Sequence, residues 1–437
     1  MIATPRSQLN SAQSIRAAVV VLPLALVFAL AIVGTQAAHA QTFTVIHSFA
    51  GPEGAFPEAG FTIDAAGNLF GTTSEGGSND GNILELTYGR SGWTLASLYV
   101  FAGGRDGNYP EGDVSIAADG TLYGTTKMGG ASCVNDPYGY GCGTVYHWAP
   151  PPRTPRAPYV IYRFLGGTDG AFPQSELTFD ESGSIYGTTF GGGFEGNVNC
   201  LVGGCGTVYK LTPSGGGWKE TILHSFRGGD GGQNPWGGVV FDRAGNLYGT
   251  TARGGGYQNC DPDCGVIYEL TPSGSGWVQQ ILHIFTGGSD GASPIGGLIL
   301  DSSGNLYGTT STGGSGGGGT VFELTPTNGG WTFTTLYGIP GGGLTYGGVR
   351  GTLVMDNAGN LYGTTNEGGT YDRGSVFKLT PSNGAWRYTS LHDFDSGDPA
   401  KGWFPVPGVV LDSQGNVYGM TDSGGTNNLG LIFEITP

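Results

Sequence analysis

The sequence predicts an all-β fold: a seven-bladed β-propeller whose ring closes by pairing the N-terminal strand with the C-terminal blade. Three observations predict it. A heptapeptide, GNLYGTT in its commonest form, recurs in seven near-identical copies that begin at residues 67, 120, 183, 245, 304, 359 and 415. The copies mark repeats of 53 to 63 residues, each with four strand-like segments between turn signals. The chain also begins and ends in different parts of the repeat.

Residues 1–40 have the pattern of a signal peptide, which leaves residues 41–437 as the propeller. Two arginines precede an apolar run over residues 19–33, and Ala38-His39-Ala40 is typical of a cleavage site. A membrane span needs roughly 20 apolar residues, so an uncleaved anchor is the less favoured alternative. We expect a secreted or periplasmic protein with no membrane span in the mature chain.

The first mature segment, residues 43–49, has the character of the fourth strand of a blade. A complete blade follows the pattern of the fifth repeat, in which strands are expected at residues 297–300, 305–310, 320–324 and 331–337. The turn before the heptapeptide carries an aspartate whose side chain can accept hydrogen bonds from the turn's own amides. This aspartate occurs in six repeats, as Asp64, Asp180, Asp242, Asp301, Asp356 and Asp412, while Ala117 breaks the pattern.

The last segment, residues 431–435, has the character of a third strand, so the seventh repeat lacks its own fourth strand. Residues 43–49 can supply it. Pairing of the two ends closes a ring and removes exposed sheet edges, whereas a linear solenoid would need two distinct caps.

Six cysteines form three local pairs within consecutive repeats: Cys133 with Cys142, Cys200 with Cys205, and Cys260 with Cys264. An even number of cysteines in an exported chain favours disulfide bonds. A zinc site is the alternative, but it needs about four converging ligands, and these loops contain no histidine.

Composition excludes some partners. The 87 glycines suit turns, because 38% hydrophobic and 11% aromatic residues provide material for a core. The formal charge of −16 becomes −18 once the two N-terminal arginines are removed, and there is no basic stripe for nucleic acid. We expect a monomer that binds no nucleic acid.

The motifs LHSF, DxxGNLYGTTxxGG and GxVFELTPxxxGW, in this fixed order, resemble the GloVer tandem repeat of exported bacterial choice-of-anchor proteins across essentially the whole mature chain. The resemblance implies a propeller-like repeat protein at the cell exterior and transfers no catalytic residues. The first two strands of each repeat also look like those of NHL and gluconolactonase propellers, but the residues that follow differ.

The motifs that would support catalysis are weak. His47, His224, His283 and His392 share a position that other repeats fill with tyrosine, which favours a packing role. The loop acids Asp106, Asp169, Asp230 and Asp290 lack the spacing of a calcium loop, so turn formation is favoured over Ca²⁺ binding. No Ser-His-Asp pattern or nucleophile elbow is present.

The repeats differ most where the chain approaches the first strand, which lines the channel of a propeller. The residue after the loop proline reads Glu58, Glu111, Gln174, Trp236, Ile295, Arg350 and Val406. The residue two positions later reads Gly60, Asp113, Glu176, Gly238, Gly297, Thr352 and Gly408. We call these sets the first and second channel rings. They predict a ligand site at the channel mouth formed by Glu58, Glu111, Asp113, Gln174, Glu176, Trp236 and Arg350.

Glu111, Asp113 and Glu176 are also candidates to hold a divalent cation such as Ca²⁺, and the alternative is a solvated acidic rim. The sequence therefore favours a non-enzymatic scaffold that binds a glycan or a cell-surface protein, with no cofactor assigned. The alternatives are a cation-dependent enzyme of lactonase or polysaccharide-lyase type, and a purely structural surface protein.

Overall fold

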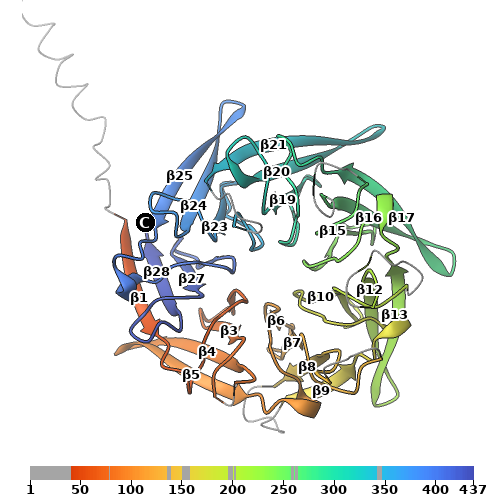
Figure 1. Ribbon diagram of the computed structural model, residues 1–437, viewed down its shortest axis with the longest axis horizontal. Helices are drawn as coiled ribbons and strands as arrows, with labels where there is room; N and C mark the ends of the chain where they lie inside the picture. Colours follow the sequence, from red (N-terminus) through yellow and green to blue (C-terminus); the bar gives the residue numbers. More distant parts are fainter. Residues whose placement is uncertain are drawn as a thin grey trace, which may run out of the picture. The chain divides into compact units, whose positions relative to one another are not determined.

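The protein is described by a computed structural model that covers residues 41–437 except residue 78 and the segments 135–138, 150–157, 195–199, 201–202, 257–259, 261–263 and 342–346. The unit Thr42–Thr436 consists of seven four-stranded sheets arranged as blades around a common axis (Figure 1). The predicted fold class is confirmed. The predicted signal peptide lies outside the described residues. Within the described part, none of the helices has the length and apolarity of a membrane span.

Within each blade, neighbouring strands pair antiparallel, and the four strands are ordered from the centre of the ring outward (Figure 1). The innermost strands are β2 (Thr62–Ile63), β6 (Ser115–Ile116), β10 (Thr178–Phe179), β14 (Val240–Phe241), β18 (Ile299–Leu300), β22 (Val354–Met355) and β26 (Val410–Leu411). The second strands, which contain the heptapeptide, are β3 (Leu69–Thr73), β7 (Leu122–Thr126), β11 (Ile185–Thr189), β15 (Leu247–Thr251), β19 (Leu306–Thr310), β23 (Leu361–Thr365) and β27 (Val417–Thr421).

The third strands are β4 (Asn82–Gly89), β8 (Thr144–Trp148), β12 (Thr207–Ser214), β16 (Val266–Ser273), β20 (Gly317–Thr327), β24 (Ser375–Ser382) and β28 (Leu431–Thr436). The outer strands are β5 (Gly92–Val100), β9 (Tyr159–Arg163), β13 (Gly217–Ser225), β17 (Gly276–Ile284), β21 (Gly330–Pro340), β25 (Ala385–Asp393) and β1 (Thr42–Ser48). Short 3₁₀ turns follow four outer strands: η1 (Gly104–Asp106), η2 (Gly167–Asp169), η3 (Gly229–Gly231) and η4 (Pro399–Lys401).

The ring closes as predicted, because β1 pairs antiparallel with β28. Thr42 lies opposite Thr436, and Ser48 lies opposite Leu431. The seventh blade therefore combines the first strand of the unit with its last three strands.

The core consists of hydrophobic layers between neighbouring blades. In the layer between blades four and five, Tyr248 and Ile267 pack with Leu306 and Phe322. The heptapeptide glycine makes this packing close: a Cβ atom on Gly308 would lie 2.6 Å from Cζ of Phe322. The motif is therefore architectural, with leucine and tyrosine in the layers and glycine where an aromatic ring covers the strand.

The predicted aspartate turns form. In the fourth blade, Asp242 accepts hydrogen bonds from the amides of Ala244 (2.8 Å) and Asn246 (2.9 Å). It also accepts one from the Tyr248 hydroxyl at 3.0 Å. In the second blade, where Ala117 replaces the aspartate, Asp119 accepts from the amide of Thr121 instead.

The innermost strands are shorter than predicted. Residues 297–300 were expected to form a strand, but only Ile299 and Leu300 pair with the second strand. The reason is that the amide of Gly297 donates sideways to the Thr352 hydroxyl of the next blade, at 2.9 Å. A hydrogen bond between blades therefore takes the place of strand pairing within the blade at this point.

Candidate functional site

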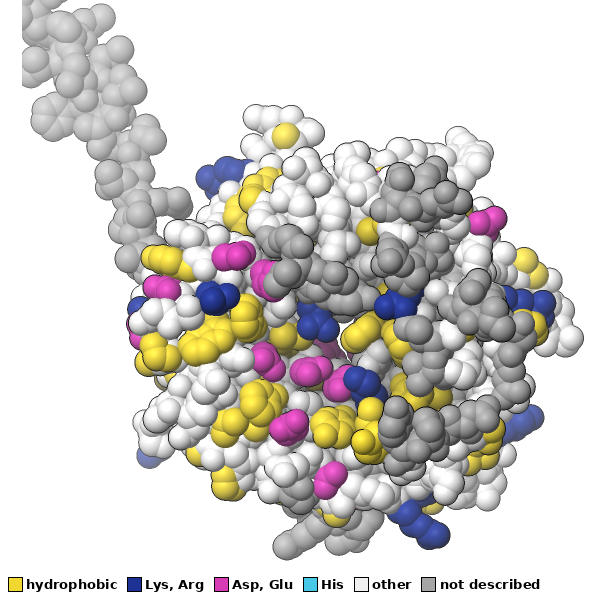
Figure 2. Space-filling model, in the orientation of Figure 1, with side chains coloured by type: hydrophobic (Ala, Val, Ile, Leu, Met, Phe, Trp, Pro, Cys, Tyr) yellow, Lys and Arg dark blue, Asp and Glu magenta, His cyan; other side chains and the backbone are white. Residues whose placement is uncertain are grey.

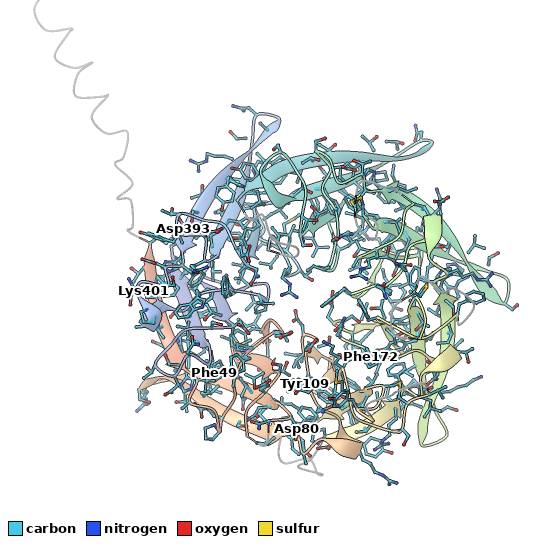
Figure 3. All side chains as sticks on the ribbon, in the orientation of Figure 1. Phe49, Asp80, Tyr109, Phe172, Asp393 and Lys401 are labelled. Carbon is cyan, nitrogen blue, oxygen red and sulfur yellow. A yellow bond between two sulfur atoms is a disulfide. The ribbon has the colours of Figure 1, made fainter. Side chains whose placement is uncertain are left out.

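The loops that lead into six of the seven blades contain a residue in the left-handed backbone region directly before the loop proline. This conformation is uncommon for residues other than glycine. Six blades have it, at Phe56, Tyr109, Phe172, Asn234, Ser293 and Phe404, with φ between 49° and 60°. Tyr109 and Phe172 are labelled in Figure 3. The next residue but one belongs to the first channel ring, so this kink aims the ring side chains.

Hydrogen bonds across the blade boundary hold the kink in place. The Phe172 amide donates to the carbonyl of Cys142 in the preceding blade at 2.8 Å, and the Phe172 carbonyl accepts from the Phe190 amide at 3.1 Å. Asn234 and Ser293 repeat the arrangement, with their amides 2.7 Å from the carbonyls of Cys205 and Cys264. The loops of two blades thus fix each ring residue.

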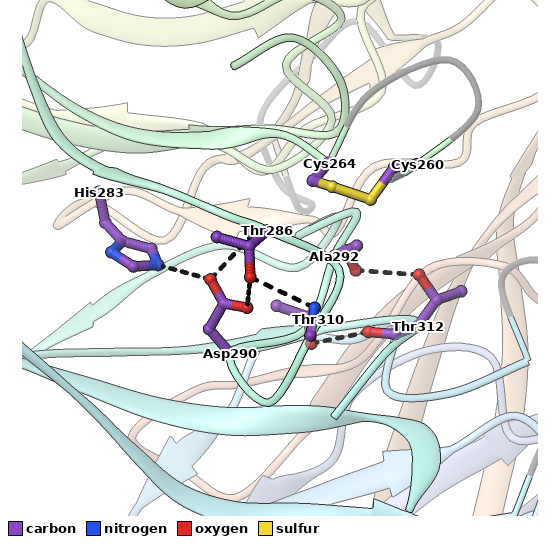
Figure 4. The surroundings of a disulfide bond; sticks show 9 residues. Cys260, Cys264, His283, Thr286, Asp290, Ala292, Thr310 and Thr312 are labelled. Carbon is purple, nitrogen blue, oxygen red and sulfur yellow. Dashed lines mark hydrogen bonds and ion pairs between the residues drawn. A yellow bond between two sulfur atoms is a disulfide. The ribbon is translucent and has the colours of Figure 1, made fainter. Parts of the chain in front are cut away.

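The predicted disulfide bonds are present, and each joins a cysteine to one whose carbonyl holds the next blade. They link Cys133 with Cys142, Cys200 with Cys205, and Cys260 with Cys264. Figure 4 shows the third bond beside the loop of the fifth blade. The disulfides therefore tether the loops that position Gln174, Trp236 and Ile295.

The structure brings all seven predicted ligand-site residues together. They line one cavity of about 60 Å³ at the channel mouth, with Thr352, glycines and apolar side chains of the last four blades completing the wall. Figure 2 shows acidic side chains gathered near the centre of this face, with basic and hydrophobic side chains beside them. Ligand binding by these residues remains a prediction.

The first ring is polar on the side of the first three blades. Glu111 forms a bidentate ion pair with Lys127, with N–O distances of 3.0 and 2.9 Å. Glu58 is exposed to the channel, but the mouth is concave and protein surrounds the carboxylate. This desolvation, followed by the nearby Glu111 carboxylate, raises the pKa of Glu58.

Lys127 is a site residue that the sequence reasoning missed. It directly follows the heptapeptide of the second blade, and this position varies between blades as strongly as the two channel rings do. Two equivalent residues also face the rings: Phe190 contacts Trp236 edge to face at 5.3 Å, and Asp422 interacts electrostatically with Glu58 and Arg350. Comparison of this third variable position would have revealed them.

Three non-glycine residues of the second ring accept hydrogen bonds from glycine amides of neighbouring blades. Asp113 accepts from Gly60 at 2.5 Å, and Thr352 accepts from Gly297 at 2.9 Å. Glu176 accepts from the amide of Gly238. Glycine at the neighbouring positions leaves space for these side chains: a Cβ atom on Gly297 would lie 2.1 Å from Oε1 of Glu176.

Two of these residues are carboxylates removed from bulk water. Burial raises the pKa of Glu176 to about 7, and the nearby Asp113 carboxylate adds to the effect. Burial also raises the pKa of Asp113, although its hydrogen bond from Gly60 acts in the opposite direction. Both groups can therefore hold a proton nearer neutrality than ordinary carboxylates do.

Two polar atoms at the cavity have no hydrogen-bond partner within the described protein. One is Oε1 of Gln174, whose side chain is buried with 6% exposure. The other is Nε of Arg350, whose guanidinium lies 6.0 Å from the ring centre of Trp236. Buried polar groups normally have a partner, so this acceptor and this donor mark where a ligand or ordered water would bind.

Metal binding by Glu111, Asp113 and Glu176 remains a prediction. Across the described ranges, no group of three or more histidine, cysteine, aspartate or glutamate residues is placed to hold a metal ion. The loop acids instead accept hydrogen bonds from groups in and beside their own loops. Asp290 accepts from the Thr286 amide at 2.9 Å and lies 3.1 Å from Nε2 of His283 (Figure 4). Asp106 similarly accepts from the hydroxyl of Tyr99 and the amide of Ala102.

Comparisons with known proteins identify the repeat. The family model described as Gloeobacter/Verrucomicrobia repeat matches residues 32–201 and again 199–433. None of the curated proteins matches the chain.

Solved propeller structures are similar in fold. A fungal alcohol oxidase of the AA5 family, in complex with copper, is 14% identical over 90% of this chain and 76% of its own, with a TM-score of 0.51. A putative gluconolactonase is 13% identical over 74% of this chain and 89% of its own, with a TM-score of 0.42. A putative glucose dehydrogenase from Thermus thermophilus is 15% identical over 91% of this chain and all of its own, with a TM-score of 0.41.

Proposed function

The chain belongs to the Gloeobacter/Verrucomicrobia repeat family, and we propose that it is an exported, non-enzymatic scaffold that binds a glycan at the mouth of its channel. The observation that carries this proposal is the unpaired acceptor of Gln174 and the unpaired donor of Arg350 in one cavity beside Trp236. A sugar presents hydroxyl groups that both donate and accept, and it presents an apolar face that an aromatic ring can cover.

The cavity volume limits what enters. Pockets that enclose a whole small molecule measure about 300–1,000 Å³, whereas this cavity is about 60 Å³. We infer that only one edge of a terminal sugar enters, while the rest of the glycan lies across the loop face. Disulfide-tethered loops around the mouth provide the rigid frame that such binding needs.

Calorimetry of residues 41–437 with neutral oligosaccharides tests the proposal. We expect wild-type protein to bind at least one of the cello-, xylo- and chitin-oligosaccharides, and Trp236→Ala to bind it at least tenfold more weakly. Tyr88→Ala is the matched control, because this aromatic side chain is 70% exposed on an outer hairpin. Equal binding by Trp236→Ala would direct the search to protein ligands or to a purely structural role, as would absence of binding to every glycan tested, amino sugars included.

A second candidate, an enzyme of lactonase or polysaccharide-lyase type, is favoured by the raised pKa of Glu176. A carboxyl group with a pKa of about 7 is suited to give and take a proton near neutral pH. The acidic lining favours a neutral lactone over an anionic uronate polymer. Acid release from sugar lactones in a pH-stat, absent in Glu176→Gln, would support the enzyme; no turnover by wild-type protein would exclude this activity.

Export is the remaining part of the proposal. Three disulfides suit an oxidising compartment outside the cytoplasm. Expression of the full chain in a bacterial host and mass spectrometry of the exported fraction should give a mature N-terminus at Gln41. Recovery of the product only in the cytoplasm with residues 1–40 attached would contradict it.

A further inference from the structure

The charges around the channel cavity are strongly asymmetric. Four carboxylates line it, from Glu58, Glu111, Asp113 and Glu176, against a single cationic side chain, Arg350. Lys127 pairs with Glu111 at 2.9 Å and so offsets only one of the four. The remaining carboxylates belong to the first three blades.

Acceptors and donors are separated in the same way. Oε1 of Gln174, in the third blade, is a buried acceptor with no partner within the described protein. It shares the cavity wall with the carboxylates of Asp113 and Glu176. The unpaired donor, Nε of Arg350, comes from the sixth blade. A ligand that fits must therefore donate several hydrogen bonds to acceptors that come from the first three blades and accept one from Arg350.

The small cavity further restricts the donating group. Since one ordered water needs about 10–15 Å³ of such space, a cavity of about 60 Å³ holds a compact group and a few waters. A primary ammonium is compact, carries one positive charge and donates three hydrogen bonds. A hydroxyl donates only one, and an acetylated amine is larger and uncharged.

We propose that the channel mouth selects glycans containing an amino sugar with a free primary amine, and that it binds the ammonium between Gln174 and Glu176 while Arg350 donates to a hydroxyl of the same sugar. This inference rests on the proposed glycan-binding function and names its ligand class. The glycan orientation follows from it: the amine lies beside the Glu176 carboxylate, which comes from the third blade and extends over Gly238 toward Gly297 of the fifth.

The test compares three trisaccharide ligands that differ mainly in the group at C2 of each unit: chitosan trisaccharide with a free amine, chitin trisaccharide with an acetylated amine, and cellotriose with a hydroxyl. Calorimetry at pH 7 and 0.15 M salt limits general attraction to this acidic protein, because the Debye length is then about 8 Å. We expect wild-type protein to bind the free amine at least tenfold more tightly than the other two.

Glu176→Gln removes the ionisable carboxyl group and keeps an oxygen that can accept from the Gly238 amide, so the preference for the free amine should fall at least fivefold. Glu58→Gln, at a side chain that faces the channel, is a second variant that should fold like wild type, and the preference should also fall. Glu181→Gln is the matched control. It removes the same charge from an exposed turn of the same blade as Glu176, and its preference should equal that of wild type.

Three results would overturn the inference. If the three trisaccharides bind equally, the proposal of glycan binding is supported and the proposed selection of a free amine is contradicted. If none binds, both the inference and the glycan proposal fall. If Glu181→Gln weakens binding of the free amine as much as Glu176→Gln and Glu58→Gln do, the amine is attracted by overall charge and not by this cavity.

Discussion

At the scale of single residues, the kink before each loop proline is the feature on which the channel mouth depends. Its left-handed backbone costs about 1–2 kcal/mol for a residue with a side chain, yet it recurs in six blades. The hydrogen bonds from both neighbouring loops offset that cost. The strain lies directly beside the ring residues that we assign to ligand binding, where a precise direction of the chain matters most.

Ser293 tests this interpretation, because its side chain is small and its φ is 54°. Ser293→Val places a β-branched residue in the left-handed region and should lower the free energy of unfolding by about 1–3 kcal/mol. Ser293→Gly should leave stability unchanged or raise it slightly, since glycine adopts this conformation freely. Urea denaturation of both variants measures the difference; equal stabilities would contradict the assigned strain.

Asp301 tests the turn that recurs before the heptapeptide. Its carboxylate accepts from the amides of Ser303 and Asn305, both at 2.8 Å, and from the Asn305 side chain. Asp301→Ala should lower the free energy of unfolding by about 1–3 kcal/mol, because these donors lose their partner. Glu181→Gln, which also removes one acidic charge from an exposed turn, should leave it within about 0.5 kcal/mol of wild type. A loss in Asp301→Ala no larger than in the control would contradict the role.

These turns were predictable because the aspartate and its donors lie within a few residues of one another in sequence. The contact between Glu111 and Lys127 was not, since it joins the loop that leads into the second blade to the residue after that blade's second strand. Nor did the sequence predict that the Glu176 side chain extends past Gly238 toward Gly297. Sequence comparison identified which positions vary, but the length and direction of each side chain decide what they contact.

At the scale of elements, a hydrogen-bonded group of one tyrosine and two acidic side chains joins the outer strands of neighbouring blades. The Tyr162 hydroxyl on β9 donates to Asp169 of η2 and lies 3.0 Å from Oε2 of Glu220 on β13. Burial, followed by the nearby Asp169 carboxylate, raises the pKa of Glu220. Glu220 is therefore protonated in the folded protein at pH values where an unfolded chain is ionised.

The sign of the pH dependence follows. Above the ordinary glutamate pKa of 4.5, the folded state binds more protons at Glu220 than the unfolded state does. This contribution to the free energy of unfolding is therefore complete below pH 4.5 and is lost as pH rises toward the folded pKa. Glu220→Gln should remove this dependence, so urea denaturation at pH 5 and pH 8 should differ less in the variant than in wild type. The same pH difference in both proteins would contradict it.

The strand elements were predicted in type and order, and their lengths less well. The innermost strands have two residues where four were expected, because amides near the channel bond to side chains of adjacent blades. Strand β20 begins earlier than expected, at Gly317, within a glycine-rich stretch that had no strand signal. Local pattern shows where a strand can form, and contacts from other blades decide where its ladder ends.

At the scale of the whole unit, ring closure depends on β1. A chain that begins at residue 50 lacks this strand and leaves β28 as an unpaired edge, which promotes association between copies. We expect a lower thermal midpoint and larger species in light scattering than for a chain that begins at Gln41. A monomer with an unchanged midpoint would show that closure contributes nothing.

Closure was predictable because the ends of the sequence carry different strand types. The cavity was not, since its volume and its unpaired Gln174 and Arg350 atoms arise from side chains of different blades that meet only in the ring. The sequence predicted the residues that line the mouth, and their burial, charge balance and hydrogen bonds emerged from the three-dimensional arrangement.

The pairing of Thr42 with Thr436 also determines the order in which the blades can form. Strand β1 emerges from the ribosome long before its partner β28, so the seventh blade forms only after the strands of the other six blades have been synthesised. Contacts this distant in sequence form slowly. Until then the ring stays open, and the unit keeps unpaired strand edges that closure later removes.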